Sequence, residues 1–216
     1  VAEQIAKGKE FFARKYPEMK YLAYFQAYTN TYGELSTLRE LYEEALRQTD
    51  VVGIIIATRP DCMPQELLNY LSELSKTHFV MVEYGVETSH DATLKLINRG
   101  HTWHDVEDAV TRTAAAGVLC GAHLILGLPG EDMAHFVTTA KRISALPLST
   151  VKMHQLQVIK GTRLAQMYAA GEVTLKQWTA DEYIDVCIEM LKHLRSDLAV
   201  ERFVSQSPDG LLICPR

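Results

Sequence analysis

Two charged residues in the stretch Tyr84–His101, YGVETSHDATLKLINRGH, have the types and the spacing of a ligand-binding pair. Glu87 ends an apolar run typical of a buried strand, and Arg99 ends the helical pattern that follows. A carboxylate accepts hydrogen bonds from hydroxyl or ammonium groups, and a guanidinium binds a carboxylate in bidentate fashion. The pair could therefore clamp an amino-acid zwitterion, and an internal salt bridge without a ligand is the alternative.

A second polar segment, His123–Glu131 (HLILGLPGE), runs from a strand pattern through Gly127 into a helix with an acidic first turn. Glycine allows a flat ligand to approach the backbone closely, and the N-terminus of the next helix offers free N–H donors. An ordinary turn between a strand and a helix explains the segment equally well. The sequence contains neither G-x-x-x-x-G-K-S/T nor G-x-G-x-x-G, so these phosphate-binding loops are not expected.

His123 and His154 fall at similar depths on two neighbouring predicted strands, which suits a metal-dependent barrel hydrolase or lyase. No His-x-His pair and no third ligand at a matching strand end accompanies them, so neutral, hydrogen-bonded histidines inside the domain are favoured. His101 and His104 flank a tryptophan at a helix start and are expected to be surface or capping residues.

The four cysteines are far apart in the sequence and form no Cys-x-x-Cys pair, which argues against a zinc knuckle and a disulfide framework. They are Cys62, Cys120, Cys187 and Cys214. Cys62 lies just past a strand end and is expected to be a passive thiol near the cleft. A reducing cytoplasm is the simplest compartment for such a chain.

The length of 216 residues and the 47% of hydrophobic side chains suffice for a substantial core, so a single globular domain over residues 1–216 is expected. The formal net charge of −5 gives no overall basic field, which disfavours nonspecific nucleic-acid binding, while RNA as a specific substrate stays open. No apolar run approaches the roughly 20 residues that span a bilayer, so no membrane association is expected.

Five apolar, β-branched runs alternate with amphipathic helical patterns, which predicts an α/β fold with parallel strands covered by helices. The runs are Tyr21–Thr29, Val51–Arg59, Phe79–Glu87, Val118–Leu128 and Thr150–Ile159. Period-two alternation puts Glu83, Gly85 and Glu87 on one face of the third run. A carboxylate-bearing face suits a barrel interior better than a sheet covered on both sides, so a partial β/α barrel is preferred over an open doubly wound sheet.

The expected helices are marked by apolar stripes, among them one around Leu38–Leu46 and one that begins just after Pro64. Thr179 and Glu182 form a capping box that opens the last helix. The side chains expected to face inward on that helix are Ile184, Cys187, Met190, Leu191 and Leu194.

Both ends of the chain interrupt the expected repeat. A helical pattern around Ile5–Phe12 precedes the first strand, whereas a β/α domain normally begins with a strand. The apolar run in Leu211–Arg216 stops just after it starts. We therefore expect an upstream strand and its loop to be missing and the chain to be clipped at both ends.

Five ordered blocks of this chain resemble the radical S-adenosylmethionine (SAM) superfamily, within it the coproporphyrinogen-oxidase-like and elongator-like branch of bacterial iron–sulfur oxidoreductases. The blocks are YLAYFQAYTNTY, IIIATRPDCMP, EYGVETSHDATLKLINRGH, HLILGLPGE and VKMHQLQVIKGT, within residues 21–161. The resemblance implies a partial (β/α)6 TIM-like barrel whose first strand is missing here. It also implies the cofactors SAM and a 4Fe–4S cluster.

The resemblance further implies which residues contact SAM. A Gly-Val-Gln glutamine and an Asn-Arg arginine of the family pattern match Glu87 and Arg99, with glutamate replacing glutamine in this chain. His123 stands where the pattern often carries an acidic ribose ligand, and Gly127 matches the adenine-side turn.

Two residues at other strand ends complete the implied cofactor contacts. In β/α barrels the active site lies at the carboxyl ends of the strands. Gln26 and Thr58 match strand-end positions near the methionyl and ribose groups.

The Cys-x-x-x-Cys-x-x-Cys motif that holds the cluster in this family is absent. In the family this loop follows the first strand, so its ligands are expected upstream of this chain. None of the four cysteines can replace it on spacing grounds. The chain as given is therefore expected to be inactive in the radical reaction.

An intact protein of this kind reductively cleaves SAM to a 5′-deoxyadenosyl radical, which abstracts hydrogen from a substrate that the sequence does not identify. The resemblance implies an electron donor such as flavodoxin or ferredoxin as a partner. Two alternatives stay open: a metal-dependent β/α-barrel hydrolase or lyase that uses His123 and His154, and a cluster-less binding domain for a partner or RNA.

Overall fold

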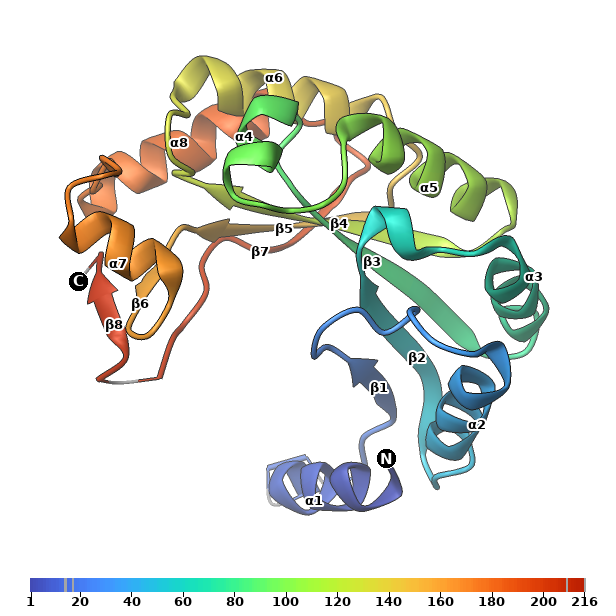
Figure 1. The fold of residues 1–216 in the computed structure, drawn as a ribbon. Coiled ribbons are helices and arrows are strands. Elements are labelled where there is room, and N and C mark those ends of the chain that lie inside the picture. The colour runs from blue at the N-terminus through green and yellow to red at the C-terminus, as the bar shows by residue number, and fades with distance from the viewer. Residues whose placement is uncertain (14, 17, 209, 216) are drawn as a thin grey trace. The chain divides into compact units, whose positions relative to one another are not determined.

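The computed structural model describes residues 1–13, 15–16, 18–208 and 210–215 (Figure 1). The strands are β1 (Tyr21–Phe25), β2 (Val51–Thr58), β3 (Phe79–Glu87), β4 (Leu119–Leu126), β5 (Thr150–Gln155), β6 (Val158–Ile159), β7 (Ala199–Arg202) and β8 (Leu212–Cys214). The helices are α1 (Ala2–Ala13), α2 (Leu35–Leu46), the 3-10 helix η1 (Pro60–Cys62), α3 (Gln65–Leu74), α4 (Asp91–Leu96), α5 (Trp103–Ala115), α6 (Met133–Ser144), α7 (Arg163–Ala169) and α8 (Ala180–His193).

Six strands form one sheet in the order β1-β2-β3-β4-β5-β7, and the pairs β1–β2, β2–β3 and β5–β7 are parallel. The order in space follows the order along the chain, as in a β/α barrel, whereas a doubly wound sheet reverses its order at a switch point. Within the described residues β1 and β7 are the two edges of this sheet, so the barrel is partial. The predicted fold class, an α/β partial TIM-like barrel with parallel strands, is confirmed.

The chain divides into two compact units, which are described separately below. The first comprises residues 1–85 and 108–121, and the second comprises residues 86–107 and 122–216. The expectation that residues 1–216 form a single domain stays a prediction.

In the first unit, α2 packs against β2, and α3 also contributes buried leucines. The buried residues of α2 are Leu38, Tyr42 and Ala45, which confirms most of the predicted stripe. Leu41 was expected in the same stripe, but its side chain is 37% exposed because it lies at the margin of the packed face. The second predicted helix begins directly after Pro64, as expected, and this proline is its N-cap residue.

Polar side chains lie on the opposite face of the first unit's strands. On β2, Ile54 and Ile56 are buried, whereas Ile55 and Ala57 are partly exposed. Ala57 pairs with Glu83 of β3, whose carboxylate accepts a 2.5 Å hydrogen bond from the Tyr24 hydroxyl of β1. The phenol thus reaches across β2, which is consistent with the small side chain of alanine in between. The predicted carboxylate-bearing strand face is therefore present.

In the second unit, α6 packs against α8, and both helices begin with a capping box. The predicted box at Thr179 and Glu182 is confirmed. The predicted inward face of α8 is partly wrong, because Ile184 and Leu191 are exposed while Val186 is buried. The buried face of α8 contains Val186, Cys187 and Met190. Ile184 and Leu191 lie outside this face and are exposed to solvent.

The last predicted strand is too long. β5 ends at Gln155, and the separate strand β6 pairs antiparallel with β8. Val158 and Cys214 face each other in that pair and belong to a small core with Ala165. Among the helices in the described ranges, none is long and apolar enough to span a membrane.

Candidate functional site

Glu87, the last residue of β3, occupies a backbone conformation that non-glycine residues rarely adopt. Its φ angle is +64°, and the Thr88 N–H donates to the Val86 carbonyl at 2.8 Å. A hydrogen bond between residues two apart, with a positive φ between them, defines the rare and strained form of the γ-turn. Strain of this kind persists only where the surrounding structure fixes it, and it is frequent at ligand-binding sites.

The segment after Glu87 is fixed by several hydrogen bonds to α6 and to Glu131, which precedes the N-cap of that helix. The Thr88 hydroxyl donates to the Glu131 carboxylate at 2.6 Å, and the Ser89 and Thr139 hydroxyls are 3.0 Å apart. The Arg142 guanidinium donates to the Ser89 carbonyl at 2.5 Å. These bonds join positions 43 to 53 residues apart in the chain and hold the strained turn in place.

Arg99 is held by the C-terminus of α4. The Arg99 N–H donates to the Leu94 carbonyl and the Asn98 N–H to the Lys95 carbonyl, which together form a Schellman motif. Asn98 has a φ of +54° and Gly100 a φ of +84°, so both residues suit the left-handed positions of this turn. The Asn-Arg-Gly sequence therefore places the arginine through local backbone geometry.

The two charged side chains form an ion pair, with Arg99 Nη2 2.8 Å from Glu87 Oε1. The Glu87 side chain is 12% exposed and that of Arg99 is 28% exposed. Burial raises the pKa of Glu87, while the nearby charges of Arg99 and His123 oppose the rise. The predicted convergence of Glu87 and Arg99 is thus confirmed, and His123 lies within electrostatic range of the carboxylate.

The histidine predictions are partly right. His123 of β4 and His154 of β5 stack with ring centroids 5.6 Å apart, so their predicted proximity is confirmed. In the described part of the chain, no three His, Cys, Asp or Glu side chains are grouped to hold a metal ion. His104 is exposed as expected, but His101 is only 5% exposed, and the expectation of a surface position is wrong for it.

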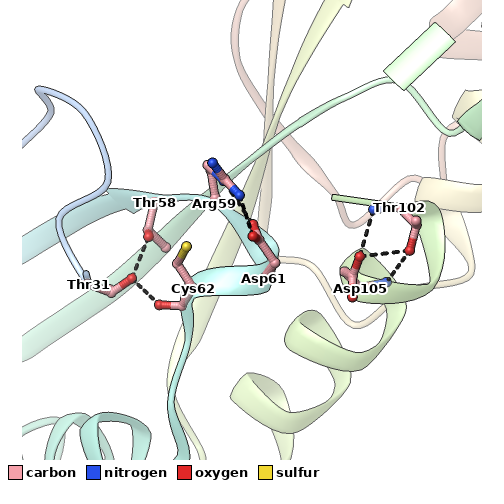
Figure 2. Close-up of polar contacts among 7 residues, drawn as sticks. All are labelled: Thr31, Thr58, Arg59, Asp61, Cys62, Thr102 and Asp105. Carbon is pink, nitrogen blue, oxygen red and sulfur yellow. Dashed lines mark hydrogen bonds and ion pairs between the residues drawn. The ribbon is translucent and has the colours of Figure 1, made fainter. Parts of the chain in front are cut away.

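Thr102 and Asp105 form hydrogen bonds at the start of α5, directly after His101. The Thr102 N–H and hydroxyl both donate to the Asp105 carboxylate at 2.7 Å, and the Asp105 N–H donates back to the Thr102 hydroxyl (Figure 2). This pair supplies the reciprocal hydrogen bonds of a capping box at the first turn of α5.

Gly127 follows β4 with a φ of +92°, and the Trp178 ring lies against its backbone. A Cβ atom at Gly127 would be only 3.0 Å from Trp178 Cζ3. Both residues line a cavity of about 450 Å³ in the second unit, together with Leu156 and Tyr183. The flat group that lies against the Gly127 backbone in the structure is therefore the Trp178 ring.

Sequence reasoning missed Trp178, although a local signal marks it. Trp178 precedes the N-cap Thr179, and Tyr183 is the fourth residue of α8. The two rings are 5.7 Å apart, which is the hydrophobic staple that often accompanies a capping box. The staple could have been predicted, but the contact with Gly127 could not.

The two predicted site residues of the first unit differ in accessibility. Gln26 is exposed directly after β1. Thr58 is 4% exposed, and its hydroxyl is 2.5 Å from that of Thr31, which in turn donates to the Cys62 carbonyl (Figure 2). Thr58 is thus engaged within the protein. Cys62 is partly exposed, as expected for a thiol past a strand end.

The cysteines do not fit an iron–sulfur cluster, which requires three thiolates close together. Cys120, Cys187 and Cys214 are buried, and burial raises the pKa of Cys187. A raised pKa disfavours the thiolate that would bind iron. The described residues therefore contain no ligand set for the cluster.

Comparison with known proteins identifies relatives along the whole chain. A family model described as "Radical SAM superfamily" matches residues 2–143, and the model of the radical SAM C-terminal domain matches residues 148–216. Protein YtqA of Bacillus subtilis is 37% identical over 93% of this chain and 62% of its own length. Protein YhcC of Escherichia coli is 34% identical over 100% of this chain and 68% of its own length.

A solved structure supports the same fold. The archaeal Elp3 of Methanocaldococcus infernus matches with a TM-score of 0.80 over 96% of this chain and 53% of that chain. The sequence identity of 22% limits this likeness to the fold. The chain spans about two thirds of the length of the relatives YtqA and YhcC.

Proposed function

The chain belongs to the radical SAM superfamily, and from this premise we propose that it supplies the SAM-binding part of a radical SAM oxidoreductase. The observation that carries the proposal is the strained turn at Glu87, which directs a mostly buried carboxylate onto the Arg99 guanidinium. Together these two groups offer one acceptor and one bidentate donor, which complement the ammonium and the carboxylate of the methionyl part of SAM.

Each predicted site residue has a role in this proposal. Arg99 binds the methionyl carboxylate, and Glu87 binds the ammonium or a hydroxyl. His123 stands in place of an acidic ribose ligand, and its ring nitrogens offer hydrogen-bonding positions to a ribose hydroxyl. The cavity beside Gly127, which Trp178 also lines, accepts the adenine.

Gln26 and Thr58 remain proposed contacts of the methionyl and ribose groups. Gln26 suits such a role because its amide is exposed. The hydroxyl of Thr58 already contacts Thr31, so its contribution to ligand binding is positional.

The 4Fe–4S cluster of the family cannot be assigned to the cysteines of this chain, for the reasons given above. We attribute its ligands to a segment outside this sequence. For the whole protein we propose reductive cleavage of SAM to a 5′-deoxyadenosyl radical that abstracts hydrogen from an unidentified substrate, with a flavodoxin or ferredoxin as electron donor. The metal-dependent hydrolase has less support, because the described side chains offer no third ligand beside His123 and His154.

Titration calorimetry of this chain with SAM tests the binding proposal. We expect saturable binding that Arg99→Ala and Glu87→Ala each weaken by about 30-fold or more, since each change leaves a mostly buried charge without its partner. Arg47→Ala is the matched control, because this exposed guanidinium pairs only loosely, 3.8 Å from Glu43. Unchanged affinity in both site variants would show that the clamp is misassigned.

The activity proposal needs the full-length protein. After anaerobic reconstitution with iron and sulfide, it should release 5′-deoxyadenosine when SAM and a reductant are added. Cluster-loaded protein that releases none would refute the proposed reaction.

A further inference from the structure

One wall of the cavity in the second unit is formed by a segment that follows β7 and has no regular secondary structure. We call this segment, residues 203–208, the strap. Val204 of the strap lines the cavity together with Gln155 at the end of β5. Val204 is 50% exposed and Phe203 is 39% exposed, so the strap bounds the cavity with little buried apolar surface of its own.

Two glutamine side chains hold the middle of the strap. The Gln155 amide donates to the Ser205 carbonyl at 3.2 Å, and its oxygen accepts from the Ser205 N–H at 3.0 Å. The Gln157 amide donates to the same carbonyl at 3.0 Å, and its oxygen accepts a hydrogen bond from the Ser207 hydroxyl. Both groups of each side-chain amide are thus used to bind the strap.

These side chains act where the backbone pairing of the sheet has ended. The pairing of β7 with β5 extends to Arg202. Directly after it, the Tyr183 hydroxyl of α8 donates to the Phe203 carbonyl at 2.5 Å, and the glutamines then bind Ser205. Hydrogen bonds between uncharged groups contribute modestly to stability, and segments with few buried apolar contacts open locally at a low free energy. The strap can therefore open while the rest of the unit stays folded.

The other side of the cavity is fixed more firmly. The Trp178 ring packs 5.7 Å from the Tyr183 ring and lies against the Gly127 backbone. Release of Ser205 would move the adjacent Val204 away from this aromatic side. The cavity thus has one packed wall and one wall held by side-chain hydrogen bonds, and lids that control ligand exchange are drawn from segments of the second kind.

We propose that the strap is a lid over the cavity and that Gln155 and Gln157 are positioning residues that hold this lid closed. The inference rests on the proposed function, since the ligand behind the lid is the adenosyl group of SAM. The two glutamines then determine how fast a bound ligand leaves. Gln155 also lines the cavity, so a change at Gln157 tests the lid more directly.

Hydrogen exchange of single amides tests the lid without a ligand. Gln157→Ala removes the bonds to the Ser205 carbonyl and the Ser207 hydroxyl but leaves the bond from the Ser205 N–H to Gln155 in place. We expect the Ser205 amide to exchange about 10-fold faster, the factor for two lost hydrogen bonds. Amides of β4 should keep their wild-type rates, because only the strap opens.

Gln206→Ala is the matched control, because it removes an exposed glutamine from the strap itself. The Ser205 amide should exchange at the wild-type rate in this variant. An unchanged Ser205 rate in Gln157→Ala would overturn the proposal, since the strap would then stay closed without the Gln157 bonds.

The release of SAM tests the control of ligand exchange. In a Trp103→Phe parent chain, Trp178 is the remaining tryptophan and reports on the cavity in stopped-flow fluorescence. Gln157→Ala should release SAM about 10-fold faster than the parent, whereas Gln206→Ala should release it at the parent rate. If SAM binds but Gln157→Ala releases it at the parent rate, the lid role is wrong and the SAM site stands. If the parent chain binds no SAM, the proposed site is wrong and the lid role is wrong with it.

Discussion

Replacing Gly127 with alanine separates two reasons for glycine at the turn after β4. The φ of +92° is a left-handed conformation, which costs an L-residue about 1–2 kcal/mol. The new Cβ would also lie 3.0 Å from Trp178 Cζ3 and 3.1 Å from Cη2. Overpacking of this kind costs about 1–3 kcal/mol. The free energy of unfolding should therefore fall by about 2–5 kcal/mol.

The second unit contains a matched control for the backbone contribution. Gly171 has a φ of +71°, but a Cβ there would meet no atom within 4 Å. Gly171→Ala should therefore cost only about 1–2 kcal/mol. In a Trp178→Leu background the ring is gone, and Gly127→Ala should cost no more than Gly171→Ala.

Urea unfolding followed by circular dichroism measures all variants with one probe that does not depend on tryptophan. Equal losses for Gly127→Ala and Gly171→Ala in the chain that retains Trp178 would refute the steric argument. So would a cost of Gly127→Ala that is the same with and without Trp178, because additivity means that the two sites do not interact.

Two further predictions concern buried carboxylates. The raised pKa of Glu87 means that the folded chain holds this proton more tightly than the unfolded chain. Its contribution to stability is thus present below the unfolded value of about 4.3 and is lost as the pH rises through the folded pKa. The unfolding free energy of the wild type minus that of Glu87→Gln should decrease over this interval in urea titrations, and a constant difference would contradict the reasoning. Tyr24→Phe removes the 2.5 Å hydrogen bond to the buried Glu83 carboxylate and should cost about 1–3 kcal/mol in the same assay, whereas a loss below about 0.5 kcal/mol would mean that the bond contributes little.

The sequence predicts elements well where local signals and burial agree. The β3 boundaries are as predicted, because its apolar run ends at a charged residue and turn-forming residues follow. The β5 prediction fails after Gln155, because Val158 and Ile159 continue the apolar pattern although they pair with another strand. An apolar strand has the same pattern in either sheet, and only the later segment around Cys214 decides its partner.

In the candidate site, too, some features follow from local sequence signals and others depend on distant residues. The position of Arg99 follows from Asn98 and Gly100, whose preference for left-handed φ is visible in the sequence. The γ-turn at Glu87 is not visible, because glutamate has no preference for such a conformation. It depends on distant side chains of α6 and of Glu131 just before that helix, and likewise the Gly127 environment depends on Trp178, 51 residues later.

The energetics of Glu87 bear on the choice between the proposed ligand-binding role and an internal salt bridge alone. Glycine at this position would avoid about 1–2 kcal/mol of left-handed strain. A salt bridge that is open to solvent contributes about 0–1 kcal/mol, and Arg99, with 28% of its side chain exposed, is partly of this kind. The pair alone hardly offsets this strain, so the proposed ligand-binding role would account for a glutamate rather than a glycine at position 87.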